Sequence, residues 1–482
     1  MLQINSLFSP KAVLLLFVAC LGLWACALRG PAPALASHTQ ITFFEPEPNL
    51  LNPATRRSTF AQMKTLGVSA LRIVLKWHEV APDANSPHRP HFNAKSPFNY
   101  DWELYDPMVN EALRLKWRVL VTVSSPVPKW ATAAHKDLIT RPEYKAFEEF
   151  MTAAGLHYGT EVTVWGIWNE PNIAGWLMPQ WNSNGTPASP HIYRGLYQSG
   201  YAGLKAAGLK SPKVLLGETS PFGYDSVNPR YEGRAAYTRE MAPLKFLREA
   251  LCLNSSYHMV KKCAKLPVYG YGQHPYTYPS LQSPFYRPPS FDEVTIGSLS
   301  RLSNALNLAA RANAVPGHLP IYLTEFGVQS KPNEEGVSLS EQPEYDAISE
   351  KIAWEDPQVA SFAQYLLHDE SSKGRHFGYR TGLETHGGSR KAAYYGFSLP
   401  LVVTEHSGTF SLWGFVRPTR KATKVRVLVQ TPGSRSYRTL TTVSANSHGY
   451  WTLHSSTRAE HWRVSWRSPE GVVYTGAPTG VS

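Results

Sequence analysis

The sequence predicts a (β/α)8 barrel over residues 37–400, followed by a small antiparallel β-sandwich over residues 401–482. Two observations predict the barrel. Short apolar runs alternate with helical patterns from about residue 40 to residue 400, and polar residues with reactive side chains fall where several runs end. One observation predicts the sandwich, because beyond residue 400 apolar and polar residues alternate with a period of two. Residues 1–36 are set apart as an export signal.

The export signal is indicated by its order of charge, apolar run and small residues. Lys11 precedes an apolar run at residues 12–28, and a Pro-rich spacer then leads to Ala34-Leu35-Ala36. This order predicts a signal peptide cleaved after Ala36, and hence a secreted or cell-surface protein. An uncleaved membrane anchor is an alternative, because the run nearly spans a bilayer. A lipid anchor on Cys26 is a second alternative.

The eight apolar runs define the predicted barrel strands. They are ITFF (41–44), ALRIVLKW (70–77), WRVLVTVS (117–124), VTVWGIW (162–168), KVLLGE (213–218), VYGYGQHPY (268–276), IYLTEFG (321–327) and VASFAQYLLHD (359–369). Helical patterns lie between them at 58–67, 105–116, 141–159, 192–208, 243–252 and 296–313. Buried runs that alternate with helices indicate parallel strands joined by crossover helices. An open doubly wound sheet is the alternative, but a barrel brings the ends of many strands to one mouth.

The predicted sandwich rests on three alternating segments, TFSLWGFV (409–416), KVRVLVQT (424–431) and HWRVSW (461–466). Trp462 and Trp466 alternate like core residues, so we expect this unit to pack its aromatics inward. Trp451 is the candidate for an exposed, ligand-binding aromatic. The unit could bind a ligand, contact the cell envelope or cap the barrel.

Composition and charge bound the class of protein. Of 482 residues, 43% are hydrophobic and 17% charged, which excludes a disordered chain or a coiled coil. Once the signal is removed, Cys252 and Cys263 remain and predict one disulfide, with two free thiols as the alternative. The net charge is +12, and residues 401–482 hold ten Lys or Arg against three Asp or Glu. For an exported chain this favours anionic polymers or the envelope over nucleic acid, unless the basic face is merely solvated.

Two glutamates stand at strand ends that would face each other across the barrel mouth. Glu170 follows the fourth run in Trp-Asn-Glu-Pro, and Glu325 follows the seventh in Thr-Glu-Phe-Gly. Paired carboxylates in a cleft can divide the roles of acid/base and nucleophile. A separation of about 5 Å would give retention of anomeric configuration at a glycosidic carbon.

These paired motifs resemble those of the clan A glycoside hydrolases over roughly residues 40–400, with families 5 and 39 the most similar. The resemblance implies an exported retaining glycoside hydrolase that acts on a poly- or oligosaccharide. It assigns Glu170 as acid/base and Glu325 as nucleophile. A transglycosylase with the same residues is an alternative, and so is a non-catalytic glycan-binding protein on the same barrel.

Four further positions match the clan and are predicted to contact substrate or to support the glutamates. Arg72 would hold Glu325 ionised, and Asn169 would donate to the sugar 2-hydroxyl. His274 would orient the acid/base, and Tyr276 would donate a hydrogen bond to Glu325. The clan's tryptophan at the end of strand eight is missing, and Gln364 or Tyr365 takes its place.

Tryptophans in or beside the strand-end loops are candidate walls for sugar rings, whose C–H faces stack on indoles. Trp77, Trp130 and Trp176 are the predicted substrate contacts, with Trp168 and Trp181 as further candidates. We expect at least two of the five to line a groove.

The sequence shows no metal-ligand spacing and no Gly-rich phosphate loop, so we expect no catalytic metal and no cofactor. Glu218 is a third strand-end carboxylate, interpreted as a substrate contact or a structural partner. We expect a monomer. The sugar, the linkage, and endo or exo action are set by the loops and stay open.

Overall fold

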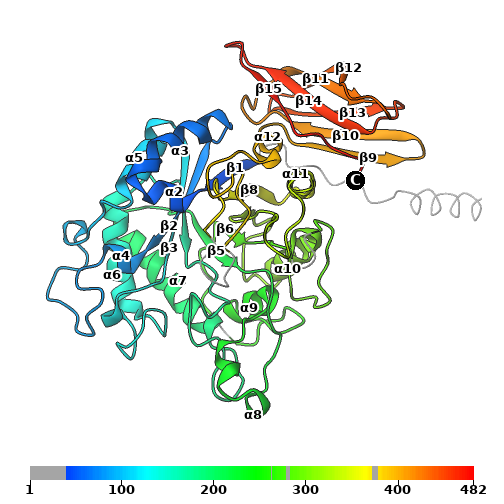
Figure 1. Cartoon of the computed structure of the whole chain (residues 1–482). Helices are drawn as coiled ribbons and strands as arrows, with labels where there is room; N and C mark the ends of the chain where they lie inside the picture. Colours follow the sequence, from blue (N-terminus) through cyan, green and yellow to red (C-terminus); the bar gives the residue numbers. More distant parts are fainter. Residues whose placement is uncertain (1–39, 262, 278–282, 372–377) are drawn as a thin grey trace, which may run out of the picture.

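The computed structural model describes residues 40–261, 263–277, 283–371 and 378–482, and the predicted signal peptide lies outside these residues. Its larger unit is a closed barrel in which each strand pairs in parallel with the next and β8 pairs with β1 (Figure 1). The strands are β1 (Ile41–Glu45), β2 (Ala70–Lys76), β3 (Arg118–Ser124), β4 (Val164–Ile167), β5 (Val214–Thr219), β6 (Gly270–Gln273), β7 (Ile321–Leu323) and β8 (Val359–Tyr365). The predicted (β/α)8 fold is therefore confirmed.

Helices surround the strands, as the apolar and polar spacing predicts. They are α2 (Glu47–Leu51), α3 (Pro53–Thr65), α4 (Trp77–Val80), α5 (Asp106–Arg114), α6 (Tyr144–Tyr158), α7 (Ser189–Ala206), α8 (Pro229–Glu232), α9 (Pro243–Ala250), α10 (Ser300–Arg311), α11 (Gln342–Glu355) and α12 (Ala392–Ser398). Short 3-10 helices lie at Pro97–Asn99, Lys129–Ala131, Gly233–Thr238 and Ile296–Ser298. Neither α11 nor α12 is among the predicted helices, and the apolar residues of α11 do not form one clean stripe.

The second unit is a sandwich of two antiparallel sheets, also as predicted. One sheet has the order β13-β10-β9 and the other β12-β11-β14-β15. The strands are β9 (Leu401–His406), β10 (Thr409–Phe415), β11 (Thr423–Gln430), β12 (Arg438–Ala445), β13 (Tyr450–Ser455), β14 (His461–Arg467) and β15 (Val473–Thr475). Trp462 and Trp466 lie in its core, and Trp451 lies there too, 3% exposed. The aromatic considered for ligand binding is thus a packing residue.

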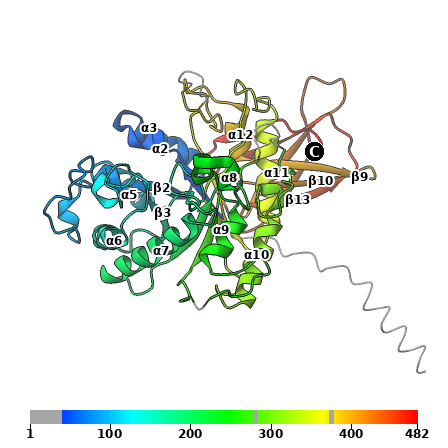
Figure 2. The ribbon, with the colours of Figure 1, turned by 90° about the horizontal axis from the view of Figure 1, so that it is seen from below.

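The two units share a tightly packed junction. Arg417, 1% exposed, donates to the Phe397 carbonyl (2.7 Å), to Thr42 Oγ1 (2.7 Å) and to Glu350 Oε2 (2.6 Å). Residues of α11 form one apolar cluster with β9, β10 and β13. Figure 2 shows α11 and α12 on the side of the barrel that faces the sandwich. A buried, fully paired cation and an apolar cluster therefore hold the units together.

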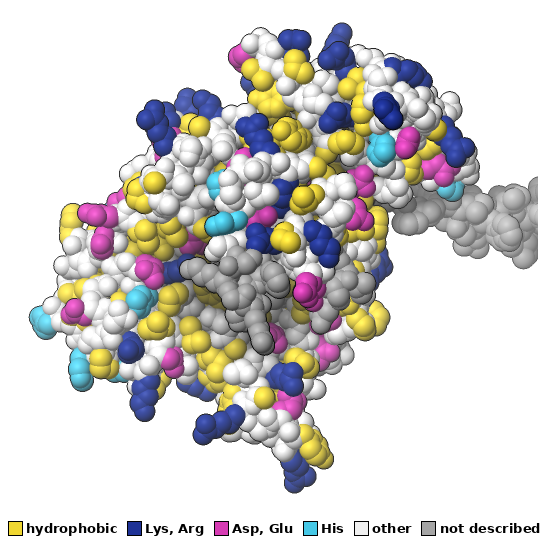
Figure 3. Space-filling view, in the orientation of Figure 1, with side chains coloured by type: hydrophobic (Ala, Val, Ile, Leu, Met, Phe, Trp, Pro, Cys, Tyr) yellow, Lys and Arg dark blue, Asp and Glu magenta, His cyan; other side chains and the backbone are white. Residues whose placement is uncertain are grey.

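Basic side chains are spread over the visible face of both units rather than gathered into one field (Figure 3). Cys252 and Cys263 form the predicted disulfide. Among the described residues, no helix combines the length and apolar character needed to cross a bilayer.

Candidate active site

The loop after β4 carries Glu170 on a strained backbone. Trp168 and Glu170 have φ of +72° and +40°, a region that residues other than glycine rarely adopt. Hydrogen bonds hold this conformation: Trp168 Nε1 donates to the Trp176 carbonyl (2.9 Å) and the Glu170 amide to the Glu218 carbonyl (3.0 Å). Strain of this kind persists only where surrounding contacts determine it, and such sites are often functional.

Glu325 follows β7 and is ringed by donors. Arg72 Nη1 donates to its Oε1 (2.7 Å) and the Tyr276 hydroxyl to its Oε2 (3.1 Å), while His274 Nδ1 lies 3.6 Å from Oε2. Burial acts to raise the pKa of Glu325. The charges of His274 and Arg72 and the hydrogen bonds outweigh burial and hold that pKa below its ordinary value. The carboxylate is therefore kept ionised, as a nucleophile requires.

Glu170 and Glu325 meet at the mouth of the barrel through His274. His274 Nδ1 lies 3.0 Å from Glu170 Oε1, and this nitrogen and one oxygen from each glutamate lie within 4.8 Å of one another. One oxygen of each glutamate therefore lies within 4.8 Å of the other, and retaining glycosidases hold their two carboxyl groups about 5 Å apart. Both side chains keep some contact with solvent, 15% exposed for Glu170 and 11% for Glu325.

Arg72 is the centre of the charge network, and it contacts more carboxylates than the sequence analysis expected. It is 1% exposed and also donates to Asn169 Oδ1 (2.7 Å), to Glu218 Oε2 (2.6 Å) and to Glu45. Burial raises the pKa of Glu45 well above its ordinary value, and the charge of Arg72 acts against that rise. Arg72 therefore holds three carboxyl groups together, those of Glu45, Glu218 and Glu325.

Glu45 is a site residue that sequence reasoning missed, although it ends the first strand of the barrel. Its position at a strand end was the available signal, but no motif marks it. Glu218 is 1% exposed and accepts from Arg72 and Thr122 Oγ1, so it acts as a structural partner here. The side-chain oxygen of Asn169 accepts a hydrogen bond from Arg72, so its NH2 group is the part that could donate to a sugar hydroxyl.

Glu170, His274 and Glu325 together have the donor atoms and the spacing to hold a metal ion. The sequence predicts these three residues in one site but shows no metal-ligand spacing, because they come from three different strand ends. The same atoms are already engaged with one another and with Arg72 and Tyr276, which suits a hydrogen-bonded acid pair.

A cluster of tyrosines lies beside the two glutamates. Tyr276 packs edge-on against Tyr365 (6.4 Å between centroids) and stacks on Tyr379 (6.5 Å). Tyr379 is 47% exposed, and its pKa is raised by burial of its hydroxyl and then by the charges of Glu170 and Glu325. Tyr379 was not predicted, because it stands in an irregular loop after β8 with no periodic pattern. Gln364 instead points its amide at backbone carbonyls, including that of Thr381.

Most of the tryptophans predicted to contact substrate are buried in this structure. Trp77 and Trp130 are 0% and 1% exposed and pack edge-on against each other, and Trp77 also stacks on Phe150. Trp168 and Trp181 are 0% and 1% exposed, so of the five candidates only Trp176 keeps a partly exposed ring. The indoles at these strand ends fill the space between the barrel and its helices.

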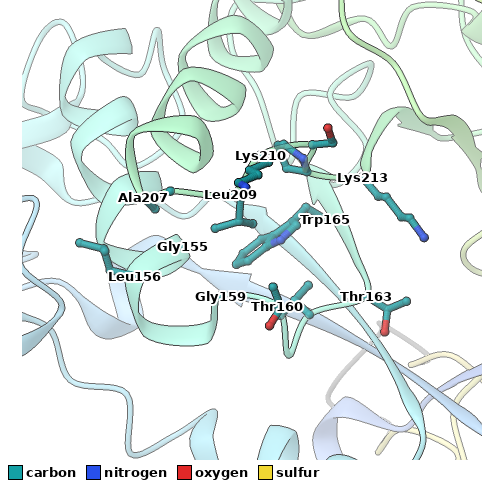
Figure 4. Close-up of a pocket in the computed structure, with 14 residues that line it drawn as sticks. Gly155, Leu156, Gly159, Thr160, Thr163, Trp165, Ala207, Leu209, Lys210 and Lys213 are labelled. Atoms are coloured by element: carbon teal, nitrogen blue, oxygen red, sulfur yellow. The ribbon is translucent and has the colours of Figure 1, made fainter.

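A cavity of about 780 Å³ lies at the opposite end of β4, where Trp165 reaches between Leu209 and Thr160 (Figure 4). It is formed by the end of α6, the end of α7 and the loop before β5. None of the described residues that line it is an acid. This cavity therefore lacks the paired carboxyl groups that lie at the other end of the barrel.

Comparison with solved structures finds the same fold in several glycoside hydrolases. A family 39 glycoside hydrolase from Bacteroides cellulosilyticus WH2 superposes with a TM-score of 0.51 at 14% identity, over 88% of this chain and 82% of that one. A glucosidase from Croceicoccus marinus gives 0.53 at 10%, over 90% and 96%. A family 39 β-xylosidase from Caulobacter crescentus gives 0.50 at 14%, over 91% and 97%. The sequence matches no protein-family model and no curated protein. At this identity the likeness shows a shared fold.

Proposed function

We propose that this chain is a retaining glycoside hydrolase that cleaves O-glycosidic bonds of a poly- or oligosaccharide. The observation that carries the proposal is the pair Glu170 and Glu325, joined by His274 with oxygens within 4.8 Å, in unequal surroundings. Glu325 alone of the two contacts a guanidinium and a phenol. One carboxyl group suited to stay ionised beside one able to exchange a proton is the arrangement that double displacement needs.

The proposed reaction has two balanced steps. Glu170 gives its proton to the glycosidic oxygen as Glu325 attacks the anomeric carbon, so the C–O bond to the leaving sugar breaks and a glycosyl ester with Glu325 forms. Glu170, now ionised, takes a proton from water, whose oxygen attacks the same carbon and frees Glu325. The amide of Asn169 would donate to the 2-hydroxyl, and Tyr379 would supply the wall that the clan builds from tryptophan.

The test is release of reducing ends and of aryl leaving groups from a panel of β-linked substrates. The glucosidase and β-xylosidase activities of the structural neighbours put aryl β-glucosides and β-xylosides first. We expect Glu325→Gln to lower the rate about 10³-fold or more, and Glu170→Gln about 10²- to 10⁴-fold. Glu405→Gln, an exposed glutamate of the sandwich, should leave the rate unchanged.

Three outcomes would redirect the proposal. Glycan binding that survives in both variants, without cleavage of any substrate, would favour a binding protein. Longer products on addition of a sugar acceptor would identify a transglycosylase. Loss of activity with a chelator would mean that the trio of Glu170, His274 and Glu325 holds a metal, which double displacement excludes because the ion would occupy the nucleophile.

We also propose that the protein is exported as a monomer with residues 1–36 removed, and that the basic sandwich contacts the cell envelope. The disulfide supports passage through an oxidising compartment. An intact mass of the exported protein that begins at Ser37 would support cleavage. A mass that retains residues 1–36 would indicate an anchor, and light scattering would test the monomer.

A further inference from the structure

A cleft of about 420 Å³ lies between the barrel and the sandwich, away from the proposed active site. The barrel contributes residues at or before the starts of β1, β2 and β3, which is the end of the barrel opposite to Glu170 and Glu325. The sandwich contributes Phe415, Arg420, His448 and Tyr450. Its volume is in the range of small-molecule sites. Both units must be in place for the cleft to exist.

The cleft is basic. Lys116, Arg118, Arg420 and His448 line it, and the described lining contains no Asp or Glu. Burial, then the nearby charge of Arg417, lowers the pKa of Arg420 to about 10, and Arg118 acts in the same direction. Glu350 offsets this in part, but its Oε2 is already bound by Arg417. Cations gathered this closely repel one another unless an anion joins them.

The floor of the cleft holds donors without acceptors. Nε and Nη2 of Arg420 and Nε2 of Gln40 are buried and have no hydrogen-bond partner among the described residues. Buried donors in folded proteins are nearly always paired. Arg417, three residues away, has an acceptor for each of its three nitrogens, whereas two of the three nitrogens of Arg420 have none among the described residues. Unpaired N–H groups and excess positive charge in one place are the features of an anion site.

We propose that this cleft binds a tetrahedral oxyanion, sulfate or phosphate, either free or as the ester group of a polymer, and that the anion joins the sandwich to the barrel. Arg420 and Gln40 would donate to its oxygens from the floor, one from each unit. Arg118, Lys116 and His448, which are all exposed, would balance its charge at the rim. The proposal does not depend on the glycosidase activity.

The experiment is thermal unfolding of the full chain in sodium sulfate, with sodium chloride added to keep the ionic strength constant. Binding to the folded state raises the melting temperature in a saturable way, whereas the general effect of sulfate as an excluded salt does not saturate. We expect saturation in the wild type and in Arg435→Gln, which removes an exposed arginine of the same unit. We expect Arg420→Gln to keep only the non-saturating part. An identical saturable response in Arg420→Gln would overturn the proposal.

A rim variant keeps the test decisive if Arg420→Gln does not fold. Arg118→Gln alters an exposed side chain and should weaken the midpoint for sulfate about tenfold, and an unchanged midpoint would overturn the proposal. Dextran sulfate and neutral dextran then separate the two sources of anion. Binding of dextran sulfate that free sulfate displaces indicates an ester group, and a response to sulfate alone indicates a free ion. A wild type that responds saturably to neither probe refutes the site.

Discussion

Arg72 at the barrel mouth and Arg417 at the junction are both 1% exposed, yet their surroundings differ in charge. Arg417 faces one carboxylate, Glu350, and neutral oxygens from Phe397 and Thr42. Arg72 faces three carboxyl groups and the amide of Asn169. A balanced pair serves to hold two surfaces together. Several carboxyl groups around one cation instead compete for its charge, so their pKa values are shifted apart. A catalytic site can use such shifted pKa values, whereas a junction does not need them.

The largest expected effect comes from removing Arg417, the cation of the balanced pair at the junction. Arg417→Met should lower the free energy of unfolding by about 3–5 kcal/mol, because Glu350 is left buried without its partner. Thermal or denaturant unfolding measures the loss. The double variant Arg417→Met/Glu350→Gln should recover part of the stability. A single variant as stable as wild type would mean that the junction rests on its apolar cluster alone.

Removing Arg72 should affect chemistry as well as folding, because it also leaves the buried carboxyl groups of Glu218 and Glu325 without their cation. Arg72→Met removes the cation that favours ionised Glu325, so the pKa of Glu325 should rise and kcat/KM should fall about 10²- to 10³-fold. The acid limb of the pH profile should move to higher pH, since the nucleophile is protonated as pH falls through its pKa. Arg72→Lys keeps the charge but not the forked geometry, so its kcat/KM should lie between those of the wild type and Arg72→Met. An unmoved acid limb in Arg72→Met would contradict this role.

The smallest expected effect comes from removing one hydrogen bond at the barrel mouth, from the Tyr276 hydroxyl to Glu325. Tyr276→Phe removes a donor to ionised Glu325. A hydrogen bond to a charged group contributes about 1.5 kcal/mol, so its loss should raise the pKa of Glu325 by about one unit. The acid limb of kcat/KM should therefore move up by about one pH unit, measured on whichever aryl glycoside is cleaved. Tyr395→Phe, at an exposed tyrosine, is the matched control. Equal profiles for the two variants would remove Tyr276 from the site.

The strands and the two glutamates were the predictable part of this molecule. Val121, Ile167 and Leu323 lie in runs whose apolar character alone requires burial, and such runs became strands. The fourth and seventh runs proved shorter as strands than as apolar runs, because their last residues leave the sheet to carry Glu170 and Glu325. Arg72 could be foreseen because an arginine inside a buried run needs a partner, and the nearest strand ends supply carboxylates.

The indoles show where prediction from sequence stops. Trp77 and Trp130 stand beside strand ends, like Trp176, and nothing in their local sequence separates a buried ring from a partly exposed one. Their burial depends on α6, whose Phe150 stacks on Trp77. The position of Tyr379 beside the glutamates likewise depends on tertiary contacts, with Tyr276 after β6 and Tyr365 at the end of β8.

The sequence by itself determined the repeating strands and helices, the period-two sandwich and the two glutamates at strand ends, because local spacing decides which side chains share a face. Only the tertiary structure decided which groups meet. Glu45 and Glu218 join Arg72 from the first and fifth strands, and Gln40 and Arg420 face one cleft from two separate units. The physical reason is that charge and hydrogen bonding act through distance in space, and closing the barrel and docking the sandwich set those distances between residues far apart in the chain.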